Sequence, residues 1–204
     1  MSTILAALGH FIISTISSLG YPGVALLMAI ESANIPLPSE VIMPFSGFLA
    51  STGRFVLVLV ALAGATGELA GALFSYYLGA KGGRPLIEKY GRYILMSRRD
   101  LDAADRWFKR RGNITIFVGR LLPVVRTFIS LPAGIARVNL GTFSLYTFAG
   151  SIIWSYFLAL VGFKLGENWD SLKVYFHRAD LVIGILIVLG IGYWVYRHIK
   201  YSRT

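Results

Sequence analysis

Apolar runs separated by short polar or proline-containing breaks make up most of the chain. Residues 55–79 and 140–165 are long enough to cross a bilayer, for which about 20 residues suffice. Residues 181–196 form a third predicted span, and residues 3–19 form a shorter run that either crosses the membrane or lies at its interface. The pattern therefore predicts an all-α membrane protein.

Two further apolar segments are interrupted by prolines. The interruptions are Pro36, Pro38 and Pro44 within residues 21–50, and Pro123 and Pro132 within residues 114–136. Proline lacks an N–H group and clashes with the preceding turn, so neither segment is expected to form one continuous helix. Irregular backbone is tolerated at membrane depth only where protein or a water-filled cavity satisfies it. We therefore predict two re-entrant hairpins.

The order of these elements repeats along the chain. Gly47 and Gly134 are 134 − 47 = 87 positions apart, and Gly79 and Gly166 are 166 − 79 = 87 positions apart. Each half is a broken hairpin followed by a span, and interrupted segments at corresponding places in two halves indicate a transporter site near the bilayer midplane. The predicted parts of this single membrane domain (1–204) are an N-terminal helix (1–20), repeat one (21–79), a basic cytoplasmic segment (80–113), repeat two (114–166) and a C-terminal transmembrane helix (180–199).

Composition supports the membrane class and narrows the chemistry. Of 204 residues, 55% are apolar and only 15% are charged, whereas a soluble domain has about 25% charged residues. The net charge of +10 would suit nucleic acid, but the cations flank apolar runs, which favours anionic lipid headgroups. The absence of cysteine excludes disulfides, thiolate nucleophiles and sulfur metal sites.

The distribution of basic residues predicts the orientation. Residues 81–111 hold half of the chain's 20 lysines and arginines, so this segment and the basic C-terminus should be cytoplasmic. Within it, residues 97–112 are predicted to form a short amphipathic surface helix. Residues 164–178 then face outward, and the two hairpins enter from opposite sides. The predicted fold is an inverted repeat of two re-entrant hairpins, each followed by a transmembrane helix, plus a C-terminal transmembrane helix.

Five ionisable residues fall inside the predicted membrane segments. They are Glu31, Glu40, Glu68, Arg120 and Arg126. Each buried charge costs about 2.5–3.5 kcal/mol even on a lenient scale, so these residues need partners. The proline breaks would let Glu31, Glu40 and the two arginines fold toward a common point near the membrane centre. Glu68 is either a third acidic member of the site or a partner for a backbone or arginine donor.

These charges admit a functional and a structural interpretation. Arg120 and Arg126 could bind a phosphate, because the planar guanidinium fork matches its oxygens. Burial favours the neutral form of a carboxyl group, so Glu31 or Glu40 could carry a coupling proton, with Glu68 as a further candidate. Alternatively, the charges are buried ion pairs that hold the hairpins together.

No enzyme chemistry is apparent from the sequence. His10, His177 and His198 lie near the chain ends, so neither histidine-based catalysis nor a metal cluster is expected. We therefore predict a protein that is not an enzyme, without a catalytic residue, metal or cofactor.

Several motifs occur in an order that is specific to one family. They are E-x-x-x-x-P-x-P-x-E from Glu31 to Glu40, G-E-L-A-G-x-x-x-x-Y-Y-L-G-x-x-x-G from Gly67 to Gly83, Gly119-Arg-Leu-Leu-Pro-Val-Val-Arg126, Pro132-Ala-Gly134, and Phe143 and Gly150 with Trp154. With this pattern, the chain from about residue 21 to residue 166 resembles the DedA family of bacterial membrane proteins, which is similar to eukaryotic scramblases.

The resemblance implies a function and a set of site residues. Some family members are implicated in returning undecaprenyl phosphate to the cytoplasmic face, and others are linked to phosphatidylethanolamine or to pH and membrane-potential homeostasis. The family's essential acidic positions fall on Glu31 and Glu40, its essential arginines on Arg120 and Arg126, and a further acidic position on Glu68. The second acidic position is often Asp in relatives, so Glu40 departs by one methylene.

The leading hypothesis is a plasma-membrane transporter that moves undecaprenyl phosphate or a phospholipid, with possible coupling to protons. Its expected partners are therefore an anionic phospholipid or polyprenyl phosphate and protons, and not nucleic acid. A proton-coupled small-ion antiporter would use the same carboxylates without lipid. A membrane lipid phosphatase would normally need a histidine beside its arginines, and the histidines here are badly placed for that role.

The predicted orientation can be tested with single cysteines, because the chain contains none. We expect a cysteine at Arg98 or Arg106 to be protected from a membrane-impermeant thiol reagent in intact cells and to react after permeabilisation. A cysteine at Glu167, in the segment predicted to face outward, is the matched control and should react without permeabilisation. Labelling of Arg98→Cys or Arg106→Cys from outside the cell would contradict the predicted orientation.

Overall fold

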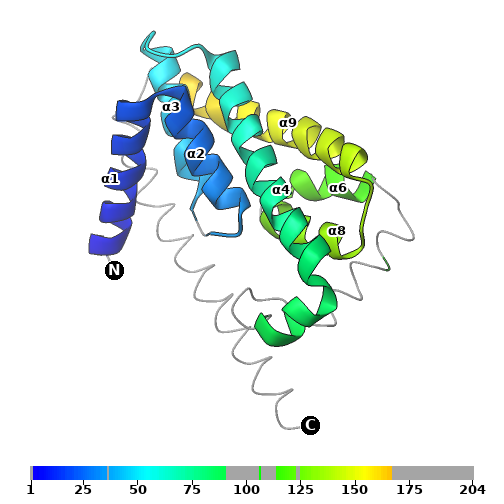
Figure 1. The fold of residues 1–204 in the computed structure, drawn as a ribbon. Coiled ribbons are helices and arrows are strands. Elements are labelled where there is room, and N and C mark those ends of the chain that lie inside the picture. The colour runs from blue at the N-terminus through cyan, green and yellow to red at the C-terminus, as the bar shows by residue number, and fades with distance from the viewer. Residues whose placement is uncertain (1, 36, 91–105, 107–113, 123–124, 167–204) are drawn as a thin grey trace. The chain divides into compact units, whose positions relative to one another are not determined.

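The computed structural model describes residues 2–35, 37–90, 106, 114–122 and 125–166 (Figure 1). Every element in these ranges is a helix, which confirms the all-α class for the described part of the chain. Their bounds are α1 Ser2–Leu19, α2 Tyr21–Ser32, α3 Ser39–Ser51, α4 Leu57–Tyr90, α6 Ile114–Arg120, α7 Val125–Phe128, α8 Ser130–Ile135 and α9 Leu140–Gly166. The helices predicted at residues 97–112 and 181–196 lie outside the described residues.

Two of the described helices are long and apolar enough to cross a membrane. They are Leu57–Gly82, which is the greater part of α4, and Leu140–Gly166, which is the whole of α9. Both agree with predicted spans, but α4 continues to Tyr90 and does not end near Gly79. Gly79 is therefore not a helix terminator. Its missing side chain instead lets the backbone of Leu131 in α8 approach α4.

The long helix α4 is the centre of the described fold. Helices α2, α8 and α9 all pack against it, and α3 packs against α9 (Figure 1). Helix α1 adds Ile12 and Ile16 to a buried apolar cluster that includes Leu27 of α2 and Met43 of α3. The two broken segments therefore lie against the two long helices.

The breaks in the first segment follow its prolines only in part. Helix α2 ends at Ser32, and α3 begins at Ser39 directly after Pro38, as the sequence predicts. Pro44, in contrast, lies inside α3, so the prediction that it interrupts the helix is wrong. Proline removes one helical hydrogen bond, here to the carbonyl of Glu40 in the first turn. The carbonyl of Pro44 itself lies where a Cβ at Gly162 of α9 would be. One lost bond near a helix end is tolerated when the packing is this close.

Glycines set the closest approaches between the helices. A Cβ at any of six positions would collide with the backbone of the neighbouring helix, which only a glycine avoids. The pairs are Gly67 with Ala25 and Gly71 with Ala29 between α4 and α2, Gly47 with Ala159 and Gly162 with Pro44 between α3 and α9, and Gly79 with Leu131 and Gly134 with Tyr76 between α4 and α8. The backbones therefore touch at all three interfaces.

We expect Gly67→Val to lower the thermal unfolding temperature of the detergent-solubilised protein. Two methyl groups and a Cβ cannot fit against the backbone of Ala25, and overpacking of this kind costs about 1–3 kcal/mol or more. Gly9→Ala, at a helical position with open space around it, is the control and should not destabilise the protein. Equal melting temperatures for the two variants would contradict the close α2–α4 approach.

Candidate functional site

Arg126 is the centre of a buried group of charges. It lies in the short helix α7 with only 1% of its surface exposed. Its Nη2 atom lies 3.2 Å from Oε2 of Glu31 in α2 and also contacts Oε1 of Glu68 in α4. Glu31 and Glu68 are buried as well. One guanidinium therefore joins carboxylates from two helices that are distant in sequence.

A fourth element contributes an aromatic ring to Arg126. The Cζ atom of Arg126 lies 5.0 Å from the ring centroid of Trp154 in α9. This geometry gives a cation–π attraction, which is strongest where water is excluded. The remaining terminal nitrogen of Arg126, Nη1, is buried and has no hydrogen-bond partner among the described residues.

Arg120 is equally buried but has hydroxyl partners. It is the last residue of α6, and its Nη1 donates to the hydroxyl of Ser32 at 3.4 Å, while its Nη2 donates to Ser130 at 2.6 Å. Helix α9 lies directly against its stem, because a Cβ at Gly150 would be 2.6 Å from the Cβ of Arg120. Its Nε atom has no hydrogen-bond partner among the described residues. Arg120 therefore has no carboxylate at bonding distance in the described part of the chain, although Glu31 is within electrostatic range.

The buried charges balance, with Glu31 and Glu68 as the carboxylates and Arg120 and Arg126 as the guanidiniums. Glu31, Arg120 and Arg126 come together, as predicted. Glu40 is exposed in the first turn of α3, so it is not one of the buried charges, although its charge acts on both Glu31 and Arg126. Glu68 takes the buried place beside Arg126. Two carboxylates and two guanidiniums are thus buried together.

Sequence reasoning missed the neutral members of this group. Ser32 and Ser130 come from the two different broken segments, and both meet Arg120. A signal was present, since Ser32 directly follows Glu31 and Ser130 is four residues after Arg126, which is one helical turn. Trp154, which the sequence analysis names only as part of a motif, also belongs to this group, because its ring lies at Arg126.

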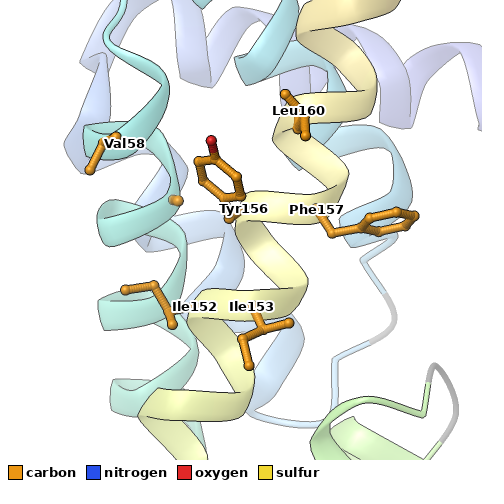
Figure 2. Close-up of a pocket in the computed structure, with 7 residues that line it drawn as sticks. Val58, Ile152, Ile153, Tyr156, Phe157 and Leu160 are labelled. Carbon is orange, nitrogen blue, oxygen red and sulfur yellow. The ribbon is translucent and has the colours of Figure 1, made fainter.

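An apolar groove of about 410 Å³ lies between α4 and α9 (Figure 2). Its lining residues are Val58, Ala61, Ile152, Ile153, Tyr156, Phe157 and Leu160. Most of the large side chains among them are substantially exposed on the protein. The groove therefore offers an apolar surface along the seam of the two helices that are long enough to cross a membrane.

Comparison with known proteins identifies the class. The VTT domain model matches residues 37–164, and the chain belongs to this family, the DedA family of membrane proteins. It is 40% identical over 176 residues to the uncharacterised membrane protein YkoX of Bacillus subtilis, covering 86% of this chain and 78% of that protein. No solved structure matches the chain.

Two named groups occur among the relatives. The chain is 35% identical to undecaprenyl phosphate transporter A of Bacillus subtilis, covering 79% of this chain and 80% of the transporter. It is 34% identical to an alkaline phosphatase-like protein of Lactococcus lactis, covering 89% of both chains. The protein is therefore a membrane protein of the transporter-containing DedA family.

We expect Arg126→Met to destabilise the protein by about 3–5 kcal/mol, because it leaves Glu31 and Glu68 buried without their cation. Adding Glu68→Gln to that variant should recover part of the loss, since one uncompensated charge is removed. Lys164→Met, at an exposed position on α9, is the control and should change stability by less than about 0.5 kcal/mol. Chemical unfolding in detergent measures all three. Independent, additive effects of Arg126→Met and Glu68→Gln would rule out their coupling.

Proposed function

We propose that this protein moves a phosphate-bearing lipid, with a polyprenyl phosphate such as undecaprenyl phosphate as the preferred substrate, across the plasma membrane. The observation that carries the proposal is the pair of buried guanidiniums, each with an N–H group that has no partner among the described residues. Guanidinium forks are well suited to phosphate oxygens. The relatives named as undecaprenyl phosphate transporters support the lipid class.

The lengths of the broken helices support re-entrant hairpins. Helices α2 and α3 have 12 and 13 residues, which at about 1.5 Å per residue span about 20 Å. A hydrocarbon core is about 30 Å thick, so neither arm crosses it alone. The first hairpin, formed by α2 and α3, would therefore enter and leave on the same side of the membrane.

The contacts of the hairpins support the proposed inverted repeat. Gly47 of the first hairpin meets Ala159 of α9, and Gly134, 87 positions later, meets Tyr76 of α4. The position equivalent to Ala159 in the first half is 159 − 87 = 72, one helical turn from Tyr76. Each hairpin therefore packs on the long helix of the other half at matching places. Such crossed packing is suited to a site shared by both halves.

Charge balance suggests how a proton takes part. Without substrate, Glu31 and Glu68 neutralise Arg126. An arriving phosphate competes for the guanidinium, and a displaced carboxyl group in a desolvated place favours its neutral form. Glu31 and Glu68 are the first candidates for this proton because both contact Arg126, and Glu40 is a further candidate. Phosphate entry and proton uptake would then be coupled.

The apolar groove between α4 and α9 fits the remainder of such a substrate. A lipid whose headgroup reaches the arginines must keep its chain in an apolar surrounding. The groove residue Ile153 directly precedes Trp154, whose ring lies against Arg126. The chain of the lipid would therefore stay at the seam of the long helices while the headgroup moves inside.

A phosphatase activity has less support, despite the names of two relatives. Of the three histidines in the sequence, His10 alone falls among the described residues, where it is exposed on α1, away from the arginines in sequence. The buried site offers arginines, carboxylates, serines and a tryptophan. We therefore propose transport without chemical change of the lipid.

We expect Arg120→Lys and Arg126→Lys each to lower the rate of undecaprenyl phosphate transport by about tenfold or more. A point ammonium replaces a fork, and hydrogen bonds to charged groups are worth enough for such a change. The measurement is transport by the purified protein in phosphatidylcholine vesicles. Arg54→Lys, at an exposed position, is the control and should transport normally.

Transport in the same vesicles also tests whether lipid movement is coupled to protons. Glu31→Gln and Glu68→Gln should weaken the dependence of transport on a pH gradient more than they reduce expression, since the amide keeps the shape of the acid. Normal transport by both Arg→Lys variants would contradict phosphate binding by the arginines. Proton flux without lipid movement would instead indicate a small-ion antiporter.

A further inference from the structure

Helix α9 carries three buried hydroxyl groups that the site described above does not use. Thr147, Ser151 and Ser155 are spaced four residues apart, are fully buried, and have no hydrogen-bond partner among the described residues. A serine or threonine in an apolar helix usually donates to the carbonyl four residues earlier. Ser46 and Ser144 do so, at 2.8 Å in each case. The three hydroxyls of α9 therefore remain available for another acceptor.

The register of α4 and α9 places these hydroxyls beside the charges. A Cβ at Gly64 would lie 2.9 Å from Oγ of Ser155, and the rings of Tyr76 and Phe143 are 4.8 Å apart. The sums 64 + 155 and 76 + 143 both equal 219, as expected for antiparallel helices in constant register.

The same sum places Ser151 opposite Glu68, because 68 + 151 is also 219. Thr147 and Ser155 then lie one helical turn to either side. The stripe of hydroxyls follows the α4–α9 interface past the buried carboxylate.

A second donor points to the same kind of ligand. Ser151 and Trp154 are three residues apart and thus neighbours on the surface of α9. The Trp154 ring lies against Arg126, and its Nε1 atom is buried with no hydrogen-bond partner among the described residues. An indole N–H group can donate a hydrogen bond but cannot accept one. The same is true of Nη1 of Arg126 and Nε of Arg120, which also have no partner among the described residues. Hydroxyls beside obligatory donors suit a ligand that only accepts hydrogen bonds, as a phosphate dianion does.

We propose that the anion site extends from the arginines onto α9, where Ser151, Ser155 and the Trp154 indole N–H donate hydrogen bonds to the phosphate as it passes along the α4–α9 interface. Ser151 is the central contact, because it lies opposite Glu68. This assignment rests on the proposed function and deepens it. It gives the headgroup donors on both sides of the buried charges, and it makes α9 a determinant of specificity for phosphate.

The test is binding by the purified full-length protein in phosphatidylcholine nanodiscs. Undecaprenyl phosphate is one probe, undecaprenol is the probe without the phosphate, and inorganic phosphate is the probe without the lipid. Ser151→Ala and Ser155→Ala should each weaken binding of undecaprenyl phosphate by about tenfold and leave binding of undecaprenol unchanged. Ser46→Ala removes a buried hydroxyl that bonds within its own helix, and it should bind like the unchanged protein.

The outcomes separate this inference from the proposed function. If the unchanged protein prefers undecaprenyl phosphate to undecaprenol, but Ser151→Ala and Ser155→Ala bind as Ser46→Ala does, the α9 subsite is wrong and the lipid proposal stands. If the unchanged protein shows no such preference but binds inorganic phosphate, and Ser151→Ala weakens that binding, the subsite stands with free phosphate as its ligand and the lipid proposal fails. Binding of neither phosphate probe overturns both.

Discussion

The contact of Arg126 with Glu31 and Glu68 imposes the strictest condition on this fold. Arg126 is 1% exposed, and removing one partner of such a buried ion pair is costly because it leaves the other charge uncompensated. The three charges come from α7, α2 and α4, so the second broken segment, the first broken segment and a long helix must meet at one place. Trp154 brings α9 to the same place. The electrostatic requirement therefore fixes the mutual arrangement of both halves.

The glycine contacts make that meeting sterically possible. Gly67 lets α4 approach the backbone of α2 at Ala25, and Gly71 does the same one turn later at Ala29. Glu68 directly follows the first glycine, and Glu31 is two residues after Ala29. Because the backbones of α2 and α4 are this close, the side chains of Glu31 and Glu68 can both reach Arg126. The charges and the glycines therefore depend on each other. The close helix packing positions Glu31 and Glu68 beside Arg126, and the ion pairs in turn stabilise the close packing.

The sequence predicted the element types well because apolar length and proline are local signals. The spans that became α4 and α9 and the break before Ser39 follow from them directly. Pro44 was misjudged because its cost depends on packing against α9, which no local pattern contains. That Glu68 and not Glu40 is buried beside Arg126 could not be predicted from the sequence, for a related reason. After a break, the rotation of the next helix about its own axis is set by its neighbours, so sequence spacing does not determine whether Glu40 faces inward. Glu68 lies in the middle of a long apolar helix, where a charged carboxylate without a buried cationic partner would be costly.

The two arginines have different partners, and under the proposed function this difference implies an order of binding for the phosphate. Arg126 contacts two carboxylates and an aromatic face, whereas Arg120 contacts two hydroxyl groups. An anion displaces a neutral hydroxyl from a guanidinium at lower cost than it displaces a carboxylate, because no charge is left uncompensated. A phosphate should therefore bind first at Arg120 and compete for Arg126 only afterwards. That second step releases a carboxylate into a desolvated place, and it is the step at which a proton would be required. Ser32 and Ser130 come from different broken segments, so under the proposed function binding at Arg120 would also replace a contact that joins the two segments.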